Sequence, residues 1–162
     1  MRKIRNVVGI LCAVIICVAG IIGQQWHLSD RDRTRSAAES LYPTLAGFGF
    51  DEIDVLESEK QILLYKHKVE NAHSSLLVRE EAASISVDDA AIKNAQRFKN
   101  IMKYCGGVFF ATDLTWNGDW SGICLYPSDP SLIPGQYISH CEGEHIYWLS
   151  KIPHTVINES GG

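Results

Sequence analysis

The sequence predicts an α+β fold, in which a single transmembrane helix precedes a small domain with a mainly antiparallel sheet and one main helix. Three observations support this prediction. An uncharged apolar run extends from Val7 to Gly23, a helical apolar pattern follows Ser86, and Asn117-Gly118 separates two β-like runs. The expected order of the domain is three strands, the helix and about four strands, βββ-α-ββββ.

The charge of the chain argues against nucleic acid as a partner. Its 162 residues include 15 Lys and Arg against 19 Asp and Glu, a net charge of -4. Arg2, Lys3 and Arg5 precede the apolar run, so the remainder holds 12 basic and 19 acidic side chains, a net charge of -7. Phosphate binding needs a clustered basic face. The sequence contains no phosphate-binding glycine loop or dinucleotide fingerprint, and no cofactor is expected.

Residues 1–29 are predicted to be a short cytoplasmic start followed by a transmembrane signal anchor. From Asn6 through Ser29 no residue is charged, and the 17 residues from Val7 to Gly23 contain no Pro. A helix rises about 1.5 Å per residue, so this run is at the short end for spanning a bilayer. Trp26 suits the interface, because indole places its ring in lipid and its N–H toward water. The lipid bilayer is therefore the first predicted partner.

Three other interpretations of the apolar run stay open. A cleaved signal peptide has a similar basic start, although Ile21 and Ile22 continue the run beyond its small residues. A lipoprotein signal needs small residues before its cysteine, whereas bulky residues precede Cys12 and Cys17. A buried helix of a soluble domain is the third interpretation.

The expected location is a bacterial-type inner (plasma) membrane, crossed once, with the C-terminal domain outside the cytoplasm. A basic start before the first apolar run is the usual arrangement of a signal anchor. Arg31, Arg33 and Arg35 follow the run and equal in number the basic residues before it, which weakens the charge asymmetry across the membrane.

Beyond the anchor, residues 30–46 are predicted to form a stalk and residues 47–154 the extracytoplasmic α+β domain. In the stalk, Thr34 or Ser36 can cap a short helix that Pro43 ends. The tail, residues 155–162, is expected to be flexible.

The domain begins with three β-like runs, residues 50–56, 62–69 and 74–78, whose simplest assembly is an antiparallel meander. Ser86 then starts the main helix, which Gly106-Gly107 ends. Apolar residues fall at helical spacing on one face of this segment: Ala91, Ile92, Ala95, Phe98, Met102 and Cys105.

A strong hairpin signal lies between residues 108–116 and 119–126. The pair Asn117-Gly118 readily adopts the positive φ angles of a two-residue type I′ turn. With these two residues as the loop, the predicted register places Ala111 opposite Cys124.

A weaker hairpin is predicted between residues 137–141 and 144–149, with its turn at Glu142-Gly143. In this geometry His140 and His145 face each other across the strands. Two imidazoles are an incomplete zinc site, and a polar turn with exposed histidines is the alternative.

Three cysteines, Cys105, Cys124 and Cys141, belong to the predicted domain. In an oxidising compartment they are expected to form one disulfide and leave one thiol, with three pairings available. The alternative is three small buried side chains, because free Cys is often buried. The sequence does not choose between these two.

Four aromatic side chains in the last third are candidates for ligand binding: Trp116, Trp120, Tyr137 and Trp148. On alternating strands they can form a platform for a glycan or a peptide, and the alternative is cross-strand packing. Trp120, which has polar neighbours near the hairpin tip, is expected to be the best exposed.

These features predict a non-enzymatic interaction protein, whose extracytoplasmic domain binds a protein or another envelope ligand such as a glycan. The sequence contains no nucleophile elbow and no His-Glu-x-x-His zinc helix, and no catalytic residue is assigned. The alternative function is a membrane-tethered hydrolase that a metal ion at His140 and His145 assists.

Overall fold

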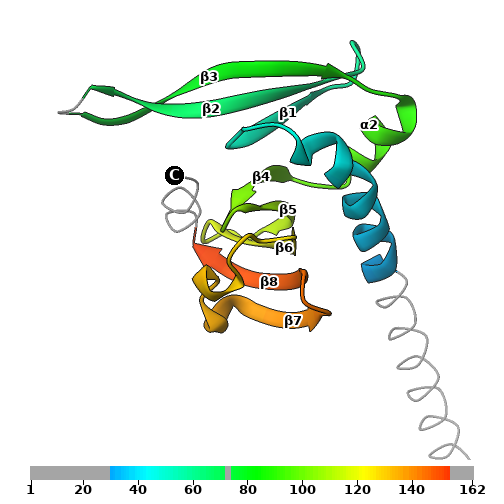
Figure 1. Ribbon diagram of the computed structural model, residues 1–162, viewed down its shortest axis with the longest axis vertical. Helices are drawn as coiled ribbons and strands as arrows, with labels where there is room; N and C mark the ends of the chain where they lie inside the picture. Colours follow the sequence, from blue (N-terminus) through cyan, green and yellow to red (C-terminus); the bar gives the residue numbers. More distant parts are fainter. Residues whose placement is uncertain (1–29, 72–73, 154–162) are drawn as a thin grey trace, which may run out of the picture. The chain divides into compact units, whose positions relative to one another are not determined.

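The computed structural model describes residues 30–71 and 74–153, and these residues form an α+β structure with one antiparallel sheet (Figure 1). The chain divides into two compact units, Met1–Ser36 and Ala37–Gly162. The predicted anchor, residues 1–29, and the predicted tail, residues 155–162, lie outside the described residues. Within the described ranges, no helix is both long enough and apolar enough to cross a membrane.

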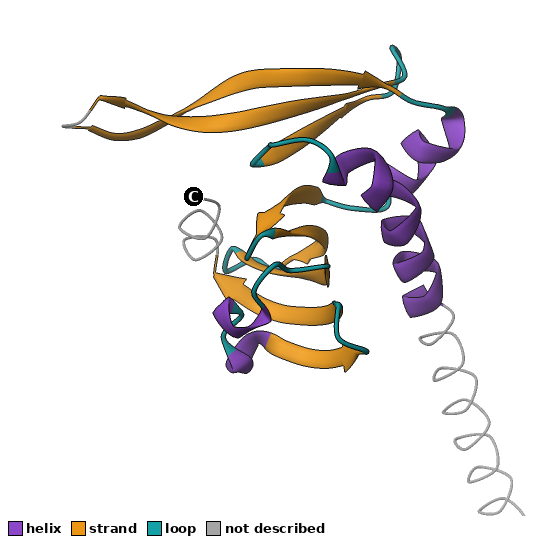
Figure 2. Cartoon of the chain, in the orientation of Figure 1, coloured by secondary structure: helices purple, strands orange, loops and turns teal. Residues whose placement is uncertain are grey.

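After the helical segment that ends at residue 46, the described residues of the second unit form eight strands, with one short helix after the third strand, so the order beyond residue 46 is βββ-α-βββββ. Strands dominate it, as the orange ribbons of Figure 2 show. The class of the predicted fold is therefore confirmed, with one strand more than expected. The elements are β1 (Glu52–Leu56), β2 (Gln61–Asn71), β3 (Ser74–Ser86), α2 (Asp89–Ala95), β4 (Asn100–Tyr104), β5 (Gly107–Leu114), β6 (Asp119–Leu125), β7 (Ile138–Glu142) and β8 (Ile146–Pro153), with 3₁₀ turns at Pro130–Leu132 and Gly135–Tyr137.

The spatial order of the strands is β3-β2-β1-β4-β5-β6-β8-β7, and all pairs are antiparallel. The sheet has two parts, β3-β2-β1 and β4-β5-β6-β8-β7, which meet at β1 and β4. Only Glu52 and Met102 pair across this junction. The backbone N–H of Lys103 also donates to the carbonyl of Asp51 at 2.9 Å.

The predicted main helix is wrong in length, because its second half is a strand. Helix α2 begins where the Asp88 carboxylate accepts from the N–H of Ala91 at 2.7 Å, and it ends after seven residues. The following β4 pairs with β5 through a two-residue turn, Cys105-Gly106, whose φ angles are 49° and 73°. Two positive φ angles define a type I′ hairpin. Pairing with β5 therefore overrides the helical spacing of residues 98–105.

The helical segment 30–46 does not end at Pro43 as predicted, but continues to residue 46. Leu41 and Leu45 on this segment have no exposed surface, and Ala38 has none either. These side chains pack with Phe110 and other sheet residues in the larger apolar cluster. Residues 37–46 of the predicted stalk thus contribute to the core of the second unit.

Both faces of the β4–β8 part of the sheet are covered. One face carries Val108, Phe110 and Ile123, which pack in the same cluster as Leu41. The opposite face carries Phe109, Cys124 and Leu149, among others, and Ile133 from the connection between β6 and β7 packs against it. Successive residues of β5 and β6 alternate between these two clusters, as a strand with two buried faces requires.

The hairpin of β5 and β6 is present, but its register differs from the prediction. Leu114 lies opposite Trp120 and Ala111 lies opposite Gly122, not opposite Cys124. The loop has three residues, Trp116 to Gly118, and only Gly118 has a positive φ, 84°. A three-residue loop with glycine in the left-handed region is the next most common hairpin after the two-residue form.

Candidate functional site

The loop of the β5–β6 hairpin is held by three hydrogen bonds around Thr115. The N–H of Thr115 donates to the carbonyl of Asp119 at 2.9 Å, and its own carbonyl accepts from the N–H of Gly118 at 2.9 Å. The Thr115 Oγ1 accepts from the N–H of Asp119 at 3.1 Å. The loop is therefore held by its backbone and by the Thr115 hydroxyl, and none of these bonds involves the side chain of Trp116.

This rigid loop presents the most exposed large apolar side chain of the described residues. Trp116 is 95% exposed, and Leu114 at the end of β5 is 46% exposed. The described residues bury almost none of the Trp116 indole, whereas aromatic side chains normally contribute most of their area to a core or an interface. We call Leu114, Trp116 and the carboxylates of Asp113 and Asp119 the tip surface.

The two carboxylates give the tip surface a negative charge. Asp113 is exposed and Asp119 is half-buried. Across the described ranges, neither carboxylate lies within ion-pair distance of a basic side chain. The tip surface thus combines exposed apolar area with two carboxylates that are available to a partner.

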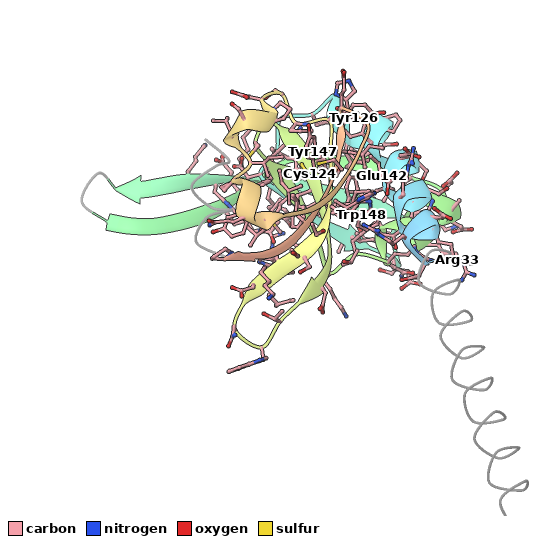
Figure 3. The ribbon with its side chains drawn as sticks, turned by 90° about the horizontal axis from the view of Figure 1, so that it is seen from below. Arg33, Cys124, Tyr126, Glu142, Tyr147 and Trp148 are labelled. Carbon is pink, nitrogen blue, oxygen red and sulfur yellow. The ribbon has the colours of Figure 1, made fainter. Side chains whose placement is uncertain are left out.

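The other three predicted aromatic residues do not join Trp116 in a platform. Trp120 is only 7% exposed, so the prediction that it is the exposed residue near the tip is wrong. Trp148, labelled in Figure 3, is 9% exposed and donates its indole N–H to the Oε1 of Glu142 at 2.7 Å. Tyr137 is half-buried and packs against the cluster that contains Trp120, on the face opposite Trp148.

Strand alternation explains the error at Trp120. Trp120 lies on the same face of β6 as Cys124, and both pack in the second apolar cluster. The pairing of Trp120 with Leu114 of β5 and Ile152 of β8 places it within the sheet, whereas Trp116 stands in the loop. The polar neighbours of Trp120 in the sequence therefore did not indicate exposure.

The predicted pairing of His140 with His145 is also wrong. His140 lies opposite Trp148, because Glu142 pairs with Ile146 and residues 143–145 form the loop. His145 instead stacks on Tyr126, with 5.6 Å between the ring centroids. Throughout residues 30–71 and 74–153, no group of three His, Cys, Asp or Glu side chains is placed to hold a metal ion.

All three domain cysteines are thiols in the structure, Cys105 and Cys124 buried and Cys141 exposed. Burial raises the pKa of the Cys105 thiol and of the Cys124 thiol, so both are protonated at neutral pH. Tyr147 of β8 pairs with Cys124 on one side and with Cys141 on the other. Because β8 lies between β6 and β7, Cys124 and Cys141 are separated by two strand spacings of about 4.8 Å each, which is too far for a disulfide.

A second surface with unusual chemistry lies on the hairpin of β2 and β3, at its base beside β1. The Arg79 guanidinium lies 2.8 Å from Asp54 Oδ1 and 3.6 Å from Glu52 Oε2, and it covers the ring of Tyr65 at 3.7 Å. The backbone N–H of His67 donates to the Asp51 carboxylate at 2.6 Å. These contacts connect all three strands, so the base of the hairpin is fixed to β1.

Two shallow hollows accompany this part of the sheet. One, of about 520 Å³, lies between Gly47–Gly49 and the hairpin, with Lys66 and the half-exposed Phe48 in its lining. The other, of about 250 Å³, lies where β1 separates from β4 and includes Asn100, which donates to Glu52 Oε1 at 2.9 Å. Neither hollow contains a nucleophile with an adjacent base, so their geometry does not indicate catalysis.

No family model, no curated protein and no solved structure matches this chain. The case for its function therefore depends on the residues themselves.

Proposed function

We propose that this chain is a small single-pass membrane-anchored protein, whose extracytoplasmic domain binds a protein partner through the tip surface and catalyses no reaction. The observation that carries the proposal is the 95% exposed indole of Trp116 on a loop fixed by backbone hydrogen bonds. The anchor remains the prediction made from residues 7–23.

A rigid loop makes Trp116 an effective binding residue. Interface hot spots are enriched in Trp, and a loop whose backbone is already ordered loses little conformational entropy on binding. Leu114, two residues before Trp116, is 46% exposed and offers further apolar area near the loop. A partner with an apolar pocket that accepts the indole fits this surface.

The charge of the tip surface favours a basic protein over a lipid surface. Asp113 and Asp119 each lie three residues from Trp116 in the sequence, and carboxylates oppose contact with anionic lipid headgroups. Lys or Arg residues at the rim of the partner's pocket would pair with them and raise the association rate. The expected partner is therefore a protein with an apolar pocket and a basic rim.

Site-specific photocrosslinking in the native cells tests this proposal. A photoreactive phenylalanine replaces Trp116 in one variant of the full chain and Leu132 in the control, because Leu132 is 61% exposed but lies in the connection after β6. We expect one discrete protein adduct from position 116 and none from position 132. Replacement of Asp113 and Asp119 by Asn should reduce the adduct, and high salt should do the same.

The control for folding is Trp116→Ala, which should leave the free energy of unfolding within about 0.5 kcal/mol of the wild type, since the side chain contacts solvent. Equal adducts from positions 116 and 132, or an adduct with lipid alone, would contradict the proposal. A reporter fused after Gly162, with a size comparison for cleavage, tests the anchor and its direction separately.

A further inference from the structure

Among the described residues, no third strand pairs with the outer half of the β2–β3 hairpin. Strand β1 pairs with β2 only from Gln61 to Tyr65, whereas β2 continues to Asn71 and β3 begins at Ser74. Figure 1 shows both strands extending past the end of β1. An isolated two-stranded hairpin is at best marginally stable in water, and three or more strands are needed for independent stability.

Strand β3 is also the last strand of the sheet, so one of its edges faces no described strand. The hydrogen bonds of β2 show which residues of β3 direct their backbone N–H and carbonyl groups away from β2, toward this edge. Tyr65 and His67 direct their backbone groups toward Asp51, so Lys66 and Lys68 direct theirs toward β3. On β3 they pair with Glu80 and Val78, so the backbone N–H and carbonyl groups of Glu80 and Val78 point toward β2.

It follows that Arg79 and Glu81, which alternate with those residues, direct their N–H and carbonyl groups to the open edge. These groups are a template for another strand. The β2–β3 pairing contains an extra residue, Ala82, between Glu81 and Ala83. Such a bulge interrupts regular pairing, so the edge available to a partner ends near Ala82.

We infer that this edge pairs with the same edge of a second copy of the chain, antiparallel about a two-fold axis at Glu80. In this register Arg79 of each copy lies opposite Glu81 of the other copy, and Val78 of each copy lies opposite Ala82 of the other. The axis also brings the two Glu80 side chains together, and each is neutralised by an ion pair with Lys68 of its own chain. The two hairpins then form a four-stranded sheet.

The charge of Glu81 selects this register from its neighbours. An axis at Glu81 would face two carboxylates that have no lysine partner among the described residues, and an axis at Arg79, whose own guanidinium is already paired with Asp54, would place Glu81 opposite the apolar Leu77. Only the axis at Glu80 places Glu81 opposite a basic residue. Like charges directly opposite each other are destabilising, and opposite charges are stabilising. The self-complementary contact of the same patch on both copies is the usual form of a two-fold interface.

Cysteine crosslinking of the full chain in mild detergent tests the inferred axis. The background carries Ser at the native positions that could react outside the core: Cys12, Cys17 and Cys141. Glu80→Cys places two thiols in a non-hydrogen-bonded pair, whose Cα atoms lie about 4.5 Å apart. Dissolved oxygen with a copper catalyst accepts the two electrons and two protons that the thiols lose as the disulfide forms. The control is Ser84→Cys, on the same strand beyond the bulge.

We expect a disulfide-linked dimer from Glu80→Cys and little from Ser84→Cys, both unchanged by Trp116→Ala. Equal crosslinking at the two positions, or none at Glu80→Cys, would overturn the inference. Because the readout does not involve the tip surface, its failure leaves the proposed function intact.

A backbone test separates the edge from its side chains. Glu81→Pro removes the outward N–H donor without removing a bond to β2, and Glu81→Ala removes only the carboxylate. By analytical ultracentrifugation we expect Glu81→Pro to weaken self-association by about thirtyfold, because two symmetry-related hydrogen bonds are lost, and Glu81→Ala to weaken it less. An unchanged association constant in Glu81→Pro would contradict pairing through this edge.

Discussion

Replacement of Leu41 by Ala tests whether the helical residues 37–46 belong to the core. Leu41 has no exposed surface, and it packs in the larger apolar cluster. The substitution removes three carbon atoms at about 0.8 kcal/mol each, or about 2.4 kcal/mol in transfer free energy. The cavity left behind adds to this loss, so the expected decrease in the free energy of unfolding is about 3 to 4 kcal/mol.

The measurement is urea unfolding of the full chain, followed by the fluorescence of its tryptophans. With a urea dependence of about 2 kcal/mol per molar, the midpoint should fall by about 1.5 to 2 M. Leu132→Ala is the matched control, because it removes the same atoms from a side chain that is 61% exposed. It should change the free energy of unfolding by less than about 1 kcal/mol. A loss at Leu41 as small as the loss at Leu132 would refute the placement of this segment in the core.

Three further outcomes are expected. Gly122→Ala should destabilise the domain strongly in the same urea assay, because its Cβ would stand 2.1 Å from a carbonyl oxygen of β5, whereas Gly135→Ala, with open space around it, should not. Burial raises the pKa of Tyr104 above its ordinary value of 10.0, so the unfolded chain ionises first. Stability should therefore fall as the pH rises above about 10 in the wild type and fall less in Tyr104→Phe. Of the three domain cysteines, only Cys141 should react with iodoacetamide in the folded chain, as peptide mapping can show.

Local chemistry predicted several elements of this fold correctly. A helix start was predicted at Ser86, and a helix does begin close by, but Ser86 is the last residue of β3 and the Asp88 carboxylate caps α2. The pair Asn117-Gly118 marks the turn of a hairpin, and Gly143, with a φ of 69°, lies in the loop of another. Each signal depends on a few adjacent residues, and neighbours in sequence are sufficient to produce it.

Other features depended on distant residues. The spacing of Phe98 and Met102 fits a helix, but Met102 pairs with Phe109 across the Cys105-Gly106 turn and also with Glu52. Pairing of β4 on both sides stabilises the strand beyond what the helical pattern offers. The predicted helix consequently combined α2 with β4.

The candidate site also depended on residues that are distant in the sequence. Aromatic composition identified Trp116 and Trp120 as candidates, but pairing with β5 and β8 buries Trp120, and a position in the loop exposes Trp116. The open edge of β3 was not predicted, because its charged residues 79–81 interrupt the apolar pattern and the predicted strand ended at residue 78.

By itself, the sequence determined the α+β class, the antiparallel hairpins and the start of α2, because turn geometry and helix capping are local. Only the tertiary structure decided the register of β6, the strand at residues 100–104 and the burial of Leu41. These features depend on which surfaces meet, and a side chain on a strand changes face when its pairing shifts by one residue. The tip surface therefore became visible only in the folded chain.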